Sequence, residues 1–91
     1  GPARDADIPV MVEVGSARAA ERPLRLELAL IKDGAPPLAI GRWEGAVSYA
    51  KPLNHSFAVP RKAMAEAGRY TLKLILSDPK GQILARVEKK M

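Results

Sequence analysis

The sequence contains no cysteine, a single histidine, and only one tryptophan, two tyrosines and one phenylalanine. The lack of cysteine excludes disulfides and thiolate metal sites. A lone histidine, His55, leaves little from which to build a Ser–His–Asp arrangement or a metal site, and there is no nucleophile elbow or glycine-rich phosphate loop. No apolar run approaches the roughly eighteen residues of a membrane span. We therefore predict no enzyme activity, no cofactor, no metal site and no membrane span.

No segment of the chain concentrates charge of one sign. Fifteen basic and ten acidic residues give a net charge of +5. The closest approaches to a basic cluster are Arg61–Lys62 and Lys89–Lys90, and the other cations are spread along the sequence. This distribution is typical of a solvated surface, although a mild excess also suits an anionic polymer such as an acidic glycan or a nucleic acid.

The length of 91 residues is that of one domain with one core. Gly1–Pro2 is typical of the remainder left when a protease removes a purification tag. We interpret residues 1–7 as this remainder with a polar lead-in, and residues 8–90 as a single domain cut from a larger protein. The abundance of alanine, arginine and proline suggests a bacterial source.

The last third of the chain has the pattern of a β-hairpin. Apolar residues recur at every second position from Tyr70 to Leu76 and again from Ile83 to Val87. Between these runs, Asp78-Pro79-Lys80-Gly81 has the composition of a type I turn that ends at a glycine with positive φ.

Similar alternation predicts strands in the rest of the chain. The leucines at 24, 26, 28 and 30 would scatter around a helix, so their strict period of two favours a strand. Pro9 has no N–H to donate, which places the strand over residues 8–14 at a sheet edge. Further strands are predicted over residues 38–44, 46–50 and 55–59, with a bulge at Gly41 or Gly45. Residues 61–67 are predicted to form one or two helical turns that end at Gly68.

Six or seven short strands separated by turns favour an all-β fold, an antiparallel β-sandwich. The segment Met64-Ala65-Glu66-Ala67-Gly68-Arg69-Tyr70-Thr71-Leu72, followed by Asp78–Gly81, resembles the E–F corner and strands F and G of immunoglobulin-like and fibronectin type III-like modules. The resemblance implies that the hydroxyl of Tyr70 bonds to backbone between Pro60 and Gly68. The chain lacks the two cysteines of true immunoglobulin domains. Such modules serve as spacers, adhesins, parts of secretion machinery and enzyme appendages, so the resemblance implies no single function. We expect a non-catalytic module of a larger bacterial protein in the periplasm or outside the cell.

The strand pattern predicts which side chains form the core. His55 is expected at the rim of this core or in solvent, and Trp43 is expected in the core. The other expected core residues are Val10, Val12, Leu24, Leu26, Leu28, Leu30, Phe57, Leu72, Leu74, Leu76, Ile83 and Val87.

A candidate binding face follows from the predicted hairpin register. Keeping Ile83, Ala85 and Val87 on the core side would place Ile75 opposite Leu84, and Lys73 opposite Arg86. Like charges in directly opposite positions destabilise a sheet unless something neutralises them.

Two functions are therefore open. The first is contact with a protein partner or with neighbouring domains of the same chain, or service as a spacer, through a face that comprises Lys73, Ile75, Leu84, Arg86 and, if its strand lies beside residues 70–77, Arg42. The second is binding of an anionic polymer through the same cations. A partner strand added to the edge at residues 8–14 is the alternative site.

Overall fold

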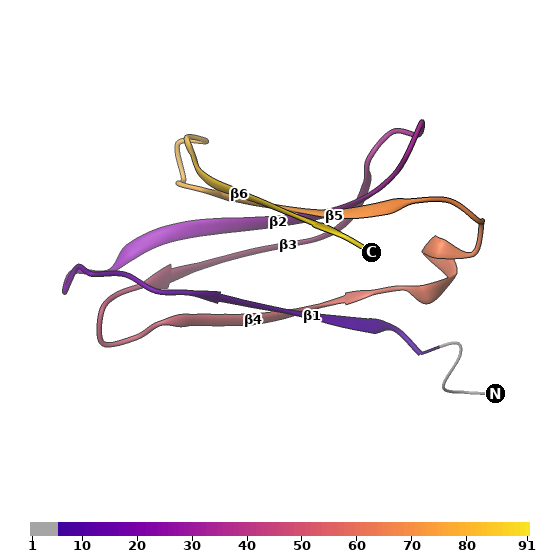
Figure 1. Ribbon diagram of the computed structural model, residues 1–91. Coiled ribbons are helices and arrows are strands. Elements are labelled where there is room, and N and C mark those ends of the chain that lie inside the picture. Colours follow the sequence, from indigo (N-terminus) through magenta and orange to yellow (C-terminus); the bar gives the residue numbers. More distant parts are fainter. Residues whose placement is uncertain (1–5) are drawn as a thin grey trace.

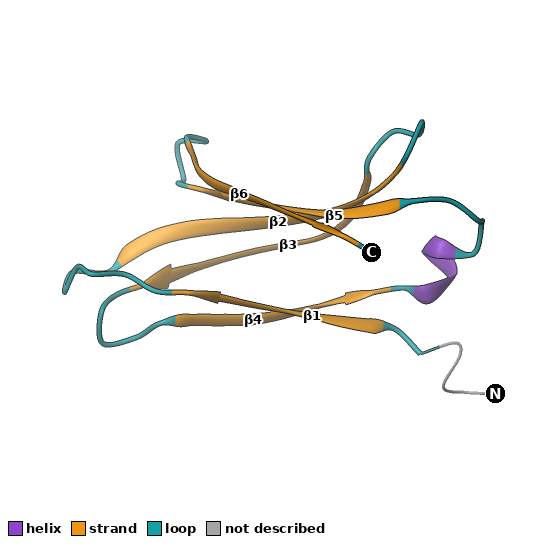
Figure 2. Cartoon of the chain, viewed as in Figure 1, coloured by secondary structure: helices purple, strands orange, loops and turns teal. Residues whose placement is uncertain are grey.

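The computed structural model describes residues 6–91, so the tag interpretation of Gly1–Pro2 lies outside the described residues. More than half of the described residues lie in strands, and the helix among them is a single 3₁₀ turn, which confirms the all-β prediction (Figures 1 and 2). Its elements are β1 (Ile8–Val14), β2 (Arg22–Lys32), β3 (Leu38–Val47), β4 (Leu53–Val59), the 3₁₀-helix η1 (Arg61–Met64), β5 (Tyr70–Ser77) and β6 (Ile83–Lys90).

The strands form a sandwich of two antiparallel sheets of unequal width. The smaller sheet pairs β1 with β4, and the larger sheet has the order β3-β2-β5-β6. Figure 1 shows the two sheets as separate layers, with β1 and β4 below the larger sheet. The prediction that residues 8–14 form an edge strand is confirmed, because β1 has only β4 as a neighbour.

The core lies between the sheets and is formed by alternate side chains of the strands. Leu24, Leu26, Leu28 and Leu30 of β2 are all buried, as their period of two predicts. Of the other predicted core residues, Val12, Phe57 and Leu72 are buried, and Val10, Leu74 and Leu76 pack against the core while remaining partly exposed. The predictions for Ile83 and Val87 are wrong, since both are exposed.

One strand, β3 (Leu38–Val47), replaces the two strands predicted over 38–44 and 46–50, and residues 48–50 lie in the loop that follows it. Its register against β2 shifts where Leu28 faces Gly41 and the next residue, Ala29, faces Ala39, which leaves Ile40 as the extra residue of a bulge. The bulge therefore lies beside Gly41, one of the two glycines proposed for it. After the bulge, the odd-numbered instead of the even-numbered side chains of β3 face the core, so that Trp43 faces inward opposite Leu26.

A corner closed by Tyr70 joins η1 to β5. The Tyr70 hydroxyl donates a hydrogen bond of 2.8 Å to the carbonyl oxygen of Glu66. This confirms the predicted bond to backbone between Pro60 and Gly68. The chain then turns at Gly68, where φ is +151°, a backbone conformation that favours glycine.

The register predicted for the β5–β6 hairpin is wrong. Asp78 closes a longer loop: its carboxylate accepts hydrogen bonds from the N–H groups of Lys80 and Gln82, and its own N–H donates to the Gln82 carbonyl. Gln82 is consequently part of the turn, and Ser77 pairs with Ile83. A second register shift follows at once, between Leu76 and Ser77, and it moves Ile83 off the core side.

Candidate functional site

The outer face of the larger sheet carries every residue of the predicted binding face except Leu84, but it does not pair like charges. Lys73 lies opposite Glu88, and Ile75 lies opposite Arg86. The predicted pairs Lys73–Arg86 and Ile75–Leu84 are therefore wrong. Leu84 is the extra residue at the register shift and packs against the core. A mixed-charge surface replaces the expected patch of unopposed cations.

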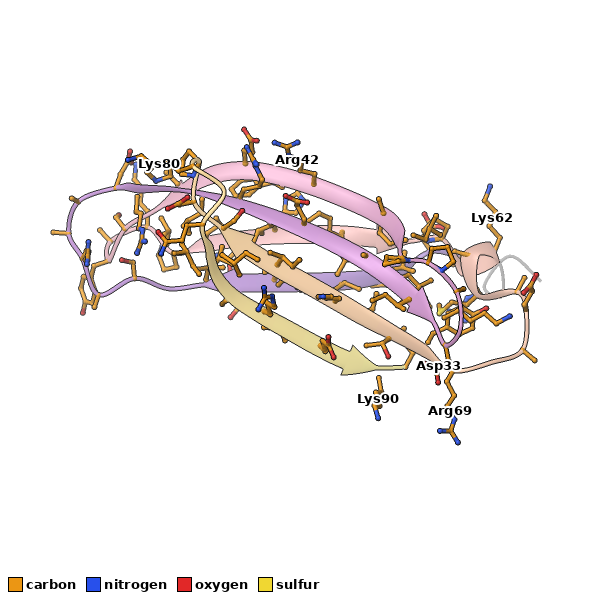
Figure 3. The ribbon with its side chains drawn as sticks, turned by 90° about the horizontal axis from the view of Figure 1, so that it is seen from above. Asp33, Arg42, Lys62, Arg69, Lys80 and Lys90 are labelled. Atoms are coloured by element: carbon orange, nitrogen blue, oxygen red, sulfur yellow. The ribbon has the colours of Figure 1, made fainter. Side chains whose placement is uncertain are left out.

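Arg42 does not lie beside β5, because β2 separates β3 from β5. Figure 3 shows Arg42 at the β3 margin of the larger sheet and Lys90 at the opposite, β6 margin. Arg42 nevertheless lines one shallow hollow of about 360 Å³ together with Glu27, Lys73 and Ile75. Three of the five predicted face residues thus meet there, and Arg86 follows Ile75 on the next strand.

Acidic side chains lie among the cations of this face, and two of the cations share one carboxylate. Arg42 Nη2 donates to Glu44 Oε1 at 2.7 Å, and Arg25 Nε donates to the same oxygen at 3.1 Å. These two guanidinium groups, with that of Arg42 acting most strongly, hold the pKa of Glu44 below its usual value. Because Glu27 and Glu88 also lie on this face, opposite Arg42 and Lys73 respectively, its geometry provides little attraction for a polyanion.

The only histidine of the chain belongs to an aromatic cluster at the margin where β3 meets β4. The ring of His55 stacks on Trp43 with centroids 5.1 Å apart and meets Phe57 edge-on at 4.5 Å. Trp43 lies over Gly45, and Phe57 approaches Gly41, so the two glycines provide the space that these rings fill. The cluster closes this margin of the sandwich by packing. His55 lies at the rim of the core, as expected, and Trp43 packs against the core but stays partly exposed.

The opposite margin of the sandwich is open. There β1 runs beside the inner face of β5 and β6, and two hollows of about 430 Å³ and 250 Å³ lie between them. Both hollows are lined by Val12, Glu13, Leu74 and Val87, so they form one continuous groove, which we call the β1 groove. One wall consists of the consecutive residues 8–15 of β1 and its end, as expected for the edge of a strand.

The floor of the β1 groove is mainly apolar and is supplied by the larger sheet. Leu72, Leu74 and Leu76 of β5 lie there beside Ala85 and Val87 of β6, with Lys89 at the end near Ile8. Val87 is 57% exposed although it faces inward, because the smaller sheet has only two strands and none of them covers β6. Sequence reasoning found the β1 edge but missed this floor, since it assigned Val87 to a closed core.

Neither a group of metal-binding side chains nor a similar known protein indicates what the β1 groove binds. Within residues 6–91, no group of three or more histidine, cysteine or acidic side chains is placed to hold a metal ion. The same residues include no helix that is long and apolar enough to cross a membrane. Comparisons of the chain with protein-family models, with curated proteins and with solved structures each found no match.

Proposed function

We propose that this domain is a non-catalytic, immunoglobulin-like module that acts by protein–protein contact, within a larger bacterial protein that works outside the cytoplasm. The observation that carries the proposal is the β1 groove, where inward-facing apolar side chains of β5 and β6 remain open to solvent. Apolar surface that the fold itself leaves uncovered is a common mark of a protein contact.

Two features support the immunoglobulin-like part of this proposal. Tyr70 closes its corner onto backbone, as the corresponding tyrosine does in those modules. The pairing of β1 with β4, and the order β3-β2-β5-β6, match strands B–E and C′–C–F–G of an immunoglobulin variable-type arrangement.

Photo-crosslinking tests the function directly. A benzophenone amino acid is placed in turn at Lys89 in the β1 groove, at Lys73 on the outer face and at Lys51 in the β3–β4 loop, three exposed or partly exposed lysine positions in separate regions. We expect a discrete protein adduct from position 89, and none from position 51. Absence of a discrete adduct from both positions 89 and 73 would contradict a protein-binding function. An adduct from position 73 alone would move the contact to the outer face.

A salt titration separates this function from polyanion binding. Binding to an acidic glycan or to single-stranded DNA weakens steeply with salt, whereas contact through an apolar groove does not. We expect no measurable binding of heparin at 150 mM salt.

A further inference from the structure

We propose that the β1 groove accepts a single extended strand of a partner protein, which pairs with the free edge of β1 and covers the apolar floor with its alternate side chains. This inference rests on the proposed protein-binding function and specifies the partner. An extended segment suits the site because one wall is a strand edge, and the floor is the inner face of a sheet.

The backbone of β1 provides a defined set of hydrogen-bonding groups at this edge. A proline is tolerated within a strand where its nitrogen points away from the paired neighbour. Pro9 therefore indicates that it, Met11 and Glu13 direct their backbone groups away from β4, toward the groove. The N–H and C=O groups of Met11 and Glu13, with the Pro9 carbonyl, are then available to an incoming strand.

The floor determines the side chains of the partner. Residues of the incoming strand that face inward would contact Leu74, Leu76, Ala85 and Val87, so every second one should be apolar. The intervening residues would face solvent and should be polar.

The charges of the groove specify which end of the incoming strand carries which charge. Glu13 lies toward one end of the groove, and Lys89 lies at the other end, near Ile8. Among residues 6–91, neither side chain forms an ion pair. A strand antiparallel to β1 would begin near Glu13 and end near Lys89. A basic residue at its start and an acidic residue at its end would complement both.

The width of the larger sheet argues against a second copy of this chain as the occupant. Two copies joined antiparallel through their β1 edges would place both larger sheets on the same side of the joined smaller sheets. There, β5 and β6 of each copy extend over the position that the other copy needs. A free strand requires no such space.

A synthetic peptide provides the test. The probe is acetyl-Lys-Thr-Val-Thr-Ile-Thr-Val-Thr-Glu-amide with a fluorescent label, and binding to the 91-residue chain is followed by anisotropy. Two further peptides carry N-methyl groups on alternate sets of amides, at positions 2, 4 and 6 or at positions 3, 5 and 7. Only one set points toward β1 in a paired strand, so we expect one methylated peptide to lose binding and the other to retain it. Equal behaviour of the two methylated peptides, or no binding of the unmodified peptide at about 1 mM, would overturn the strand proposal.

Amide exchange locates the pairing on the protein. Bound peptide should slow exchange of the Met11 and Glu13 N–H groups, while leaving those of Val10 and Val12, which face β4, unchanged. Unchanged exchange at Met11 and Glu13 with bound peptide would overturn pairing with β1.

Matched variants on β6 locate the floor. Val87→Lys places a charge on the groove floor and should weaken binding about tenfold or more. Ile83→Lys changes a similarly exposed apolar residue of the same strand that does not line the groove, and should leave binding unchanged. Lys89→Glu should weaken binding of the probe, and a peptide ending in lysine should recover it. Equal losses of peptide binding from the substitutions at 87 and 83 would overturn the proposal. It would also be overturned if the chain formed a dimer without peptide and Val87→Lys dissociated that dimer.

The two proposals fail separately. If the peptide does not bind but position 89 still gives a discrete crosslinked protein, the strand proposal is wrong and the protein-binding function stands. If no discrete adduct forms at positions 89 or 73, the function itself is contradicted.

Discussion

The Tyr70 hydroxyl and the Glu66 carbonyl oxygen lie 2.8 Å apart, and this hydrogen bond closes the corner between η1 and β5. Tyr70→Phe would leave the partly buried carbonyl without its partner. We expect a loss of about 1 kcal/mol or more of unfolding free energy, measured by urea denaturation. Tyr49→Phe is the matched control, because Tyr49 is 73% exposed and should change stability little. Equal effects at both positions would show that the corner bond contributes nothing.

This corner was predictable because its signal is local. The tyrosine, the preceding glycine and the short helical segment are close in sequence, so their relation does not depend on how distant strands pair. The leucines of β2 were predictable for a similar reason, since strict alternation determines which side chains share a face.

The hairpin face was less predictable because two extra residues, one in the turn and one at a bulge, change the pairing. Alternation correctly placed Ala85 and Val87 on the inner side, but Leu74 lies opposite Val87 instead of Ala85. The cause is the loop held by Asp78, together with the register shift at Leu84, and neither changes the apolar pattern of the strands. The exposure of Val87 depends instead on the width of the opposite sheet, which strand propensities do not specify.

The core gives a second prediction, which separates the closed part of the sandwich from the open part. Leu26 has no exposed surface, so Leu26→Ala should cost roughly 2–5 kcal/mol. Leu74 lines the groove and is partly exposed, so Leu74→Ala should cost clearly less. Denaturant midpoints with unchanged m-values would measure both losses, and an equal or larger loss at Leu74 would mean that the groove is closed in solution.

The aromatic cluster provides a third prediction through its glycines. A Cβ at position 45 would overlap the Trp43 ring, so Gly45→Ala should displace the indole and destabilise the fold by about 1–3 kcal/mol. The displacement should shift the fluorescence of the only tryptophan. Gly15→Ala is the control, since a Cβ there meets no neighbouring atom within 4 Å. Unchanged fluorescence and stability in Gly45→Ala would exclude the stacking of Trp43 over Gly45.

The shared ion pairs of Glu44 predict a dependence of stability on acid. Because Arg42 and Arg25 lower the pKa of Glu44 in the folded state, the stabilisation is present above the pKa of the unfolded chain, near 4.3. It is lost as the pH falls through the lower pKa of the folded state. Arg42→Gln should raise the pKa of Glu44 in an NMR titration, and Glu44→Gln should reduce the loss of stability below pH 4.3. An unchanged Glu44 pKa in Arg42→Gln would contradict the pairing.

The observed hairpin register predicts that Lys73→Glu lowers the stability of the fold, whereas the register expected from the sequence predicts that it raises it. Lys73 lies opposite Glu88, so Lys73→Glu places two carboxylates opposite each other and should destabilise the fold by about 0.2–1 kcal/mol. Had Lys73 faced Arg86, the same substitution would have created an attractive pair and increased stability. Adding Glu88→Lys should recover the lost stability, because it recreates an opposite-charge pair with the two charges exchanged. Both effects on stability should diminish at high salt. A gain in stability from Lys73→Glu alone, measured by denaturation at low salt, would mean that β5 and β6 pair with neither the longer loop at Asp78 nor the shift at Leu84.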